Sequence, residues 1–140
     1  MCRILIVFAL NTEINDGIIW LLKLIWSTTM IHEMNLWHDP FEKIKARTKT
    51  IEMRLYDEKR SKIAIGDVIV FTDASNGEQL ECSVLNLYRY ANFEEIYKNH
   101  DKVSIGYKSD ELALPSDMLE YYSEEQIIKY GVVGIEISVL

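Results

Sequence analysis

The segment RTKTIEMR (residues 47–54) joins a helix-like run to a strand-like run and concentrates charged side chains at the junction. Residues 50–56 alternate between apolar and polar, as expected of a strand with one face on the core. The apolar face comprises Ile51, Met53 and Leu55. Glu52 and Arg54 share the opposite face, and Lys49 stands at the corner, from which its long side chain can reach them. The sequence therefore predicts a small site built on these three charges.

The residues before this segment carry the signals of a strand followed by a helix. Residues 32–37 favour a short strand. Asp39 followed by Pro40 is typical of a helix start, with Asp39 as the N-cap and Pro40 in the first helical position. Phe41 and Ile44 then give the apolar stripe of a short helix.

After the segment, turn residues divide two apolar strands. A charged turn over 57–61 leads to a β-rich run over 68–72. The loop over 73–78 contains Asn-Gly, the strongest short hairpin signal, and a returning strand over 80–90 follows it.

Capping residues predict the remaining elements. Asn92 and Ser123 are placed to cap two helices, and Gly131 is placed to end the second one. In order, we expect a helix over 93–100, an irregular loop over 101–115, helices over 115–122 and 126–130, and a closing strand over 132–140. This order predicts an α+β fold, in which a strongly bent mixed sheet closes into a small β-barrel with several short helices packed around it.

Length and charge favour one globular domain with an uneven charge distribution. The chain has 140 residues and a formal net charge of −7. Residues 43–62 contain eight basic and three acidic side chains, a local balance of +5 that leaves −12 for the rest of the chain. Such segregation predicts a local positive field that attracts an anionic ligand, although a solvated helix face and a charged turn would give the same count.

The cysteines and histidines form no recognisable ligand pattern. Cys2 and Cys82 are far apart, which indicates neither a disulfide framework nor a zinc site, and we expect reduced thiols in a cytoplasmic protein. His32, His38 and His100 share no metal-ligand spacing and are expected to be surface or packing residues. The sequence thus predicts no metal and no cofactor.

Two apolar runs, 4–10 and 18–26, lie near the N-terminus. Neither reaches the roughly 20 apolar residues of a membrane span, and no cleavage site of a secretory signal follows. One interpretation of the second run, which contains two tryptophans, is a helix on a membrane surface. The interpretation that we favour is a natural start at Met30 or Met34, with no membrane partner.

From about Met34 to Leu140 the chain resembles the ASCH domain family, a branch of the PUA-like superfamily. The resemblance rests on the helix PFEKIK, the family-type motif G-x-K-x-x-E-x-R, the strand GD-x-I-x-F, the helix start FEE and the closing YGVVGIEI. Arg47 stands where the family usually has glycine, so a left-handed or close-approach backbone is expected to cost energy there. Residues 1–33 fall outside the resemblance and form an N-terminal extension, whereas residues 34–140 form the ASCH domain.

The resemblance implies a PUA-like β-barrel with a cleft lined by the motif. The family is thought to bind RNA, and some relatives are amidohydrolases acting on N4-acetylcytidine or ribonucleases. In the amidohydrolase branch a lysine and a threonine on this strand carry the chemistry. The lysine matches Lys49, but the threonine position falls on Glu52, so the proposed nucleophile is missing.

We therefore expect an RNA-binding protein whose cleft takes single-stranded RNA or a nucleotide-like small molecule. Lys49, Arg54 and Arg60 can contact phosphates or a base edge, and Glu52 can accept hydrogen bonds from an exocyclic amine. The aromatic candidates for stacking on a base are Trp37, Tyr88, Tyr90 and Tyr107.

Two other interpretations of the same residues stay open. As a hydrolase, the protein would use Lys49 or Glu52 as a general base, on a modified nucleoside or on RNA. As a purely structural feature, Lys49, Glu52 and Arg54 would form a salt-bridge network on a convex face. The sequence decides neither catalysis nor the oligomeric state.

Overall fold

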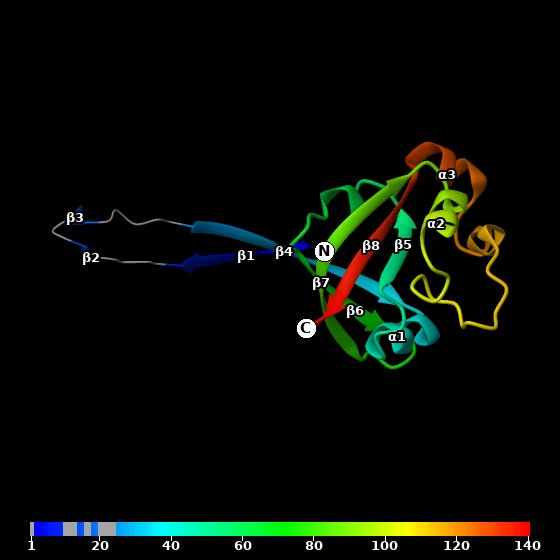
Figure 1. The fold of residues 1–140 in the computed structure, drawn as a ribbon, viewed down its shortest axis with the longest axis horizontal. Coiled ribbons are helices and arrows are strands. Elements are labelled where there is room, and N and C mark those ends of the chain that lie inside the picture. The colour runs from blue at the N-terminus through cyan, green and yellow to red at the C-terminus, as the bar shows by residue number, and fades with distance from the viewer. Residues whose placement is uncertain (1, 10–13, 16–17, 20–24) are drawn as a thin grey trace.

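A computed structural model of the chain describes residues 2–9, 14–15, 18–19 and 25–140. Its main feature is a six-stranded mixed sheet (Figure 1). In spatial order the strands are β1 (Cys2–Ala9), β4 (Ile25–Leu36), β6 (Val68–Asp73), β7 (Gln79–Tyr90), β8 (Val132–Val139) and β5 (Ile51–Leu55). The β4–β6 pair is parallel and the other pairs are antiparallel. A separate pair is formed by β2 (Ile14–Asn15) and β3 (Ile18–Ile19).

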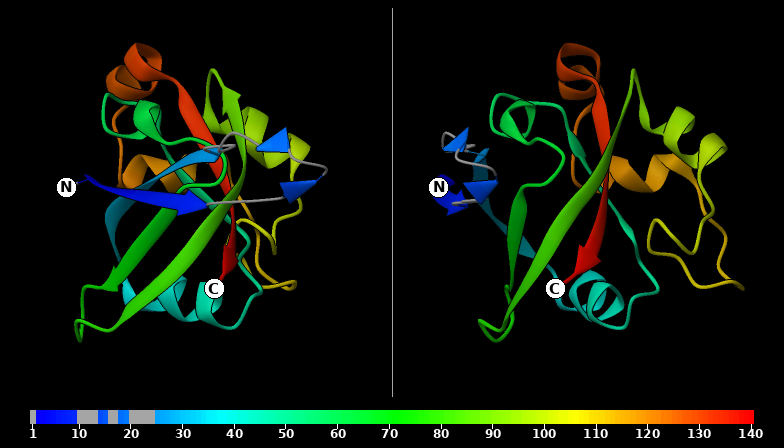
Figure 2. Two further views of the ribbon diagram at one scale, coloured as in Figure 1. Left: turned by 90° about the vertical axis from the view of Figure 1, so that its left-hand side faces the viewer. Right: turned by 60° about the vertical axis from the view of Figure 1, so that its left-hand side comes forward.

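The sheet from β4 to β5 curls strongly into a half-barrel (Figure 2), which confirms the predicted α+β, PUA-like fold class. Among the described residues no backbone ladder joins β4 to β5, so the curl stays open along that seam. Side chains bridge it instead. Arg54 Nη2 donates to the Asn35 carbonyl at 2.8 Å, and Lys59 Nζ donates to the Glu33 carbonyl at 2.9 Å.

In the part of the chain that the structure describes, five short helices surround the sheet. They are α1 (His38–Lys45), α2 (Phe93–Asn99), α3 (Glu124–Tyr130) and two 3₁₀ helices, η1 (Arg60–Lys62) and η2 (Pro115–Glu120). Asn92 caps α2 through a bond from the Glu95 amide, and Ser123 forms a capping box with Gln126, as predicted. Gly131 ends α3 with a positive φ of 68°, which confirms the predicted stop.

The predicted start of α1 is wrong by two residues. The helix begins at His38, and its N-cap is Trp37, whose extended backbone (φ −64°, ψ 158°) accepts the Phe41 amide at 3.1 Å. Asp39 therefore lies in the first turn, where its carboxylate pairs with Lys43 at 2.8 Å. Pro40 occupies the third helical position, which it tolerates because amides of the first turn have no partner within the helix.

Two apolar clusters pack on opposite sides of β5 and β8. The first fills the inside of the curl and includes Phe41, Phe71 and Ile135. The second lies under α2 and η2, which occupy the β5 side of the molecule in Figure 1. It contains the predicted apolar face of β5 together with Phe93 and Met118. Because β5 is covered on both sides, Glu52 is buried as well.

The N-terminal strands continue the sheet. β4 runs without a break through the expected boundary between the N-terminal extension and the domain, at residues 33 and 34. On the N-terminal side of this boundary His32 is fully buried, and its Nε2 lies 2.8 Å from Asp67 Oδ2. Within the run 18–26, residues 18–19 and 25–26 are strand, and residues 20–24 lie outside the described part. The natural start at Met30 or Met34 stays a prediction. None of the described helices is long and apolar enough to span a bilayer.

Candidate functional site

The corner between α1 and β5 brings the predicted charges together. Arg47 has a positive φ of 66°, the only non-glycine residue of the described chain to do so. This confirms the left-handed backbone that was expected at the family's glycine position. The Arg47 amide bonds to the Ile44 carbonyl, and the Lys49 amide folds back to the Lys43 carbonyl. The chain thus reverses direction sharply, and the Lys49 side chain points into the protein, where it is buried.

Lys49, Glu52 and Arg54 form one buried charged group. Lys49 Nζ lies 3.2 Å from Glu52 Oε1, and Arg54 Nη2 lies 3.4 Å from Glu52 Oε2. The side chains are 7%, 5% and 14% exposed, in that order. The Met53 amide also donates to Glu52 Oε1 at 2.9 Å. Two cations and one carboxylate leave a formal charge of +1 on this group.

The group keeps Glu52 ionised. Burial alone would raise the pKa of Glu52, but the charges of Lys49 and Arg54, with the hydrogen bonds from Lys49 and the Met53 amide, outweigh burial. The pKa of Glu52 therefore lies below its ordinary value. A carboxylate with a low pKa is a weak base, so this residue is better suited to accept hydrogen bonds than to remove a proton.

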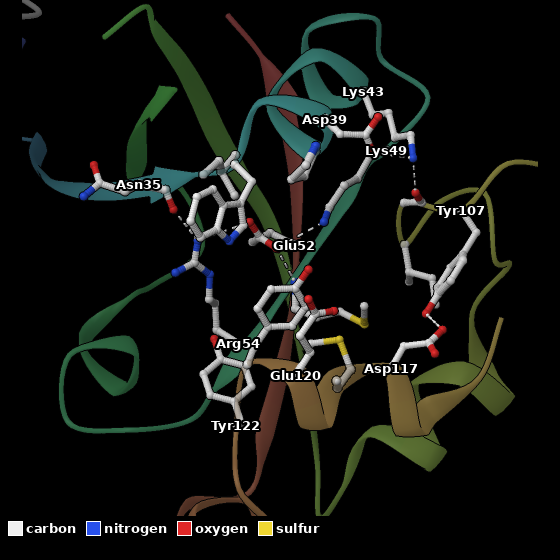
Figure 3. A pocket seen from close by; sticks show the side chains of 18 of the residues that line it. Asn35, Asp39, Lys43, Lys49, Glu52, Arg54, Tyr107, Asp117, Glu120 and Tyr122 are labelled. Carbon is white, nitrogen blue, oxygen red and sulfur yellow. Dashed lines mark hydrogen bonds and ion pairs between the residues drawn. The ribbon is translucent and has the colours of Figure 1, made fainter. Parts of the chain in front are cut away.

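These side chains form the floor of a pocket with a volume of about 560 Å³ (Figure 3). Its walls come from the end of β4, from α1, from residues 105–107 and from η2 with the tyrosines that follow it. The volume falls within the roughly 300–1,000 Å³ of small-molecule sites. The floor is thus concave, unlike the convex face that a purely structural network was expected to occupy.

The loop that walls the pocket is tied down on several sides. Lys43 Nζ donates to the Gly106 carbonyl at 2.8 Å. The amides of Thr50 and Ile51 both donate to the Ser104 carbonyl, at 2.9 and 3.0 Å. Gly106 packs directly on Lys49, because a Cβ at this position would lie 3.2 Å from Lys49 Cδ. The loop therefore fixes the position of the lysine from above.

A hydrogen-bonded chain of two tyrosines and an aspartate ties the same loop to η2. The hydroxyls of Tyr97 and Tyr107 are 2.6 Å apart, and Tyr107 donates to Asp117 Oδ2 at 2.7 Å. Since Tyr107 uses its proton for the carboxylate, Tyr97 must donate to Tyr107. Burial and these two bonds raise the pKa of Tyr107.

The pocket as a whole is acidic, contrary to the positive field expected from residues 43–62. Its basic side chains are Lys43, Lys49 and Arg54. Its acidic side chains are Asp39, Glu52, Glu111, Asp117 and Glu120. The formal balance is −2. Acidic residues from other parts of the fold reach the basic segment, and several of its cations are already paired, including Lys45 with Glu78 at 2.7 Å.

Arg60 and two of the aromatic candidates lie away from the pocket. Arg60 belongs to η1, where Nη1 pairs with Asp57 Oδ2 at 2.8 Å, and it does not line the pocket. Tyr88 and Tyr90 lie on β7, with ring centroids 4.7 and 5.9 Å from that of His100. Of the predicted stacking residues, Trp37 and Tyr107 do line the pocket.

The rim contains residues that the sequence did not single out. Their positions are set by the folding of the segment 97–122 over β5, for which the sequence carries no local signal. They are Tyr97, Asp117, Glu120, Tyr121 and Tyr122, whereas Asp39, which the sequence placed at the helix start, reaches the pocket from α1.

Comparison with known proteins identifies the family. The sequence model of the ASCH domain family matches residues 34–140 of this chain. The crystal structure of hypothetical protein PH0355 is 35% identical, with a TM-score of 0.68 over 79% of this chain and 100% of that one. The solution structure of protein PF0455 from Pyrococcus furiosus is 36% identical, with a TM-score of 0.62 over 79% of this chain and 98% of that one. No curated protein matches. The chain therefore belongs to the ASCH domain family.

Proposed function

We propose that this ASCH domain binds RNA by accepting one unpaired base, or a nucleotide-like small molecule, in the pocket above Lys49, Glu52 and Arg54. The observation that carries the proposal is the combination of a buried charged floor with exposed aromatic rings at the mouth. Trp37 and Tyr121 line the pocket and are 68% and 54% exposed. Rings of this kind offer a base a stacking surface.

The floor suits the polar edge of a base. Lys49 and Arg54 present N–H donors to a carbonyl or ring nitrogen, and the Glu52 carboxylate can accept from an exocyclic amine. The ion pairs among the three hold the donors and the acceptor in fixed positions before a ligand arrives. Such preorganisation lowers the entropic cost of binding.

The acidic rim argues for a base-sized ligand. Phosphates are repelled by the excess of carboxylates around the mouth, whereas an uncharged base is not. The sugar-phosphate backbone of a strand would accordingly stay outside the pocket. Single-stranded or looped RNA fits this requirement because its bases are free to turn outward.

Hydrolysis of a modified nucleoside or of RNA is the second candidate. The proximity of Lys49 to Glu52 supports it, because a lysine in a buried pocket is a common catalytic group. The low pKa of Glu52 and the missing threonine weigh against it. Binding is therefore the function that the geometry favours.

Binding of short labelled single-stranded RNAs and of free nucleosides, measured over a salt series, tests the proposal. Lys49→Met removes a floor donor while filling its space, and Trp37→Ala removes an exposed ring. We expect each to weaken binding by about tenfold, as for the loss of one stacking or charged contact. Lys45→Ala, outside the pocket, should bind like the wild type.

Binding that is equal in all variants would remove the pocket from consideration. Chromatography of the ligand after incubation separates the two candidates. Intact RNA and nucleoside support a binding module, whereas a product that is absent with Lys49→Met supports the hydrolase.

A further inference from the structure

Three side chains with metal-binding atoms meet outside the pocket, between α1 and the end of β6. They are His38, Glu42 and Asp73, and one ligand atom from each lies within 4.8 Å of the others. His38 and Glu42 are four residues apart on α1, so they share one face of the helix. Asp73 is the last residue of β6, where the β6–β7 turn approaches α1 (Figures 1 and 2).

The carboxylate of Asp73 is held in one orientation. It is fully buried, and Oδ1 accepts from the amide and the hydroxyl of Ser75 at 2.8 and 2.6 Å. These bonds leave Oδ2 directed at α1, where it lies 2.6 Å from His38 Nδ1. A ligand carboxylate held by outer hydrogen bonds is a regular feature of metal sites.

The cluster is separate from the pocket described above. None of its three members lines the pocket, although Asp39 and Lys43, their neighbours along α1, do. The imidazole of His38 is more than half exposed and Glu42 is exposed, so an ion can reach the cluster from solvent.

We propose that His38, Glu42 and Asp73 bind a divalent transition-metal ion of the Zn²⁺ class. One imidazole nitrogen and two carboxylate oxygens suit Zn²⁺, Co²⁺ or Mn²⁺, whereas Mg²⁺ and Ca²⁺ prefer oxygen ligands alone. Metal binding replaces the hydrogen bond between Nδ1 and Oδ2, so these two atoms, now 2.6 Å apart, separate until each lies about 2 Å from the ion, and the imidazole keeps its proton on Nε2. Water completes the coordination. The ion ties α1 to the β6–β7 turn, and α1 is the helix that delivers Lys43 and Lys49 to the pocket.

Metal titration of the full chain, stripped with a chelator, tests the site. Zn²⁺ binding is measured by calorimetry, and Co²⁺ binding by visible absorption. We expect one ion per chain, and an affinity at least about tenfold weaker in His38→Ala and in Glu42→Gln, since even outer partners of a ligand are worth that much. His100→Ala and Glu94→Gln, which change a histidine and an exposed carboxylate elsewhere, should bind like the wild type.

Glu42→Gln is the decisive variant, because an exposed helix position can lose its charge without unfolding the chain. Unchanged affinity in Glu42→Gln and His38→Ala would overturn the proposal, as would the failure of the wild type to bind Zn²⁺ at millimolar concentration. An intense near-ultraviolet band with Co²⁺ would also overturn it, because that band indicates a thiolate ligand and would place the ion on a cysteine.

Discussion

Arg47 holds a backbone conformation that costs energy for any residue with a Cβ. Its φ of 66° lies in the left-handed region, and within the described residues its side chain makes one long hydrogen bond, 3.5 Å from Nη1 to the Val139 carbonyl. Glycine is the residue that the resemblance to the family led us to expect at this position. The fold therefore tolerates local strain in order to turn Lys49 inward.

Replacing Arg47 with glycine should stabilise the protein. Removing the left-handed strain is worth about 1 kcal/mol, partly offset by the greater freedom of glycine in the unfolded chain. Urea unfolding of Arg47→Gly against Arg47→Ala isolates the effect, because alanine loses the same side chain but keeps the strain. A glycine variant no more stable than the alanine variant would contradict this account.

Glu52 gives the stability a specific dependence on pH. Its folded pKa lies below the ordinary value of 4.5, so the stability that its ionised form contributes is complete above that pH and is lost as the pH falls below it. Glu52→Gln leaves Lys49 and Arg54 buried without a counter-charge. The free energy of unfolding at pH 7 should fall by about 3 kcal/mol.

Urea unfolding at several pH values measures this. The difference between wild type and Glu52→Gln should shrink as the pH drops below 4.5. Glu78→Gln serves as the matched control, because its pair with Lys45 is close to half exposed and contributes less than about 1 kcal/mol. A difference that stays constant with pH would show that Glu52 acts through packing alone.

Among the elements, β5 depends on the loop that crosses its open edge. The Ile51 amide on that edge bonds to the Ser104 carbonyl, and the Met53 amide bonds to the Glu52 carboxylate. The loop and the charged group thus complete the hydrogen bonds that a neighbouring strand would otherwise provide. The same loop and the same charged group line the pocket.

Gly106→Ala should impair the pocket more than it impairs the fold. The new Cβ would lie 3.2 Å from Lys49 Cδ, so the lysine side chain would have to shift by a few tenths of an ångström. Gly66→Ala is the matched control, since Gly66 also has a positive φ (92°, against 115° for Gly106) but nothing within 4 Å of the new Cβ. We expect similar losses of stability by urea unfolding, and weaker binding of single-stranded RNA only for Gly106→Ala. Equal binding by both variants would argue against the role of the loop.

Local signals predicted the elements that local interactions create. Asn92, Ser123 and Gly131 act within one turn of their own helices, and the alternation of β5 correctly separated its apolar face from its charged one. Asp39 misled because it resembles an N-cap, whereas the helix starts two residues earlier, after the extended backbone of Trp37. The identity of a cap residue alone does not fix the residue at which a helix begins.

Long-range placement explains what the sequence could not predict. Asp117 and Glu120 reach the pocket only because the segment after α2 folds back over β5. Asp73 meets His38 across 35 positions of sequence. Neither arrangement corresponds to a helical or strand periodicity in the sequence. The acidic rim and the cluster of His38, Glu42 and Asp73 can therefore be seen only in the tertiary structure.

At the level of the whole molecule, charged side chains connect the two edges of the half-barrel across its open seam. Arg54 both neutralises Glu52 and binds the Asn35 carbonyl of β4, and so connects the two edges of the curl. The same opening that removes strand pairing between β4 and β5 leaves room for a ligand. The pocket therefore lies at the seam where β4 and β5 lack strand pairing.

Arg54→Met should open this seam. The variant leaves Glu52 without one of its two cations and frees the Asn35 carbonyl, at a cost of about 3 kcal/mol. Hydrogen exchange should become faster in residues 33–36 and 51–55 but not in the β6–β7 hairpin, because only the seam depends on the guanidinium. The matched control is Arg89→Met, whose guanidinium carbon lies 3.7 Å above the Tyr56 ring and contributes about 1 kcal/mol or less at an exposed position. Exchange that rises uniformly over the sheet in Arg54→Met would mean that the curl is held by its apolar interior, and that the charged seam serves the ligand alone.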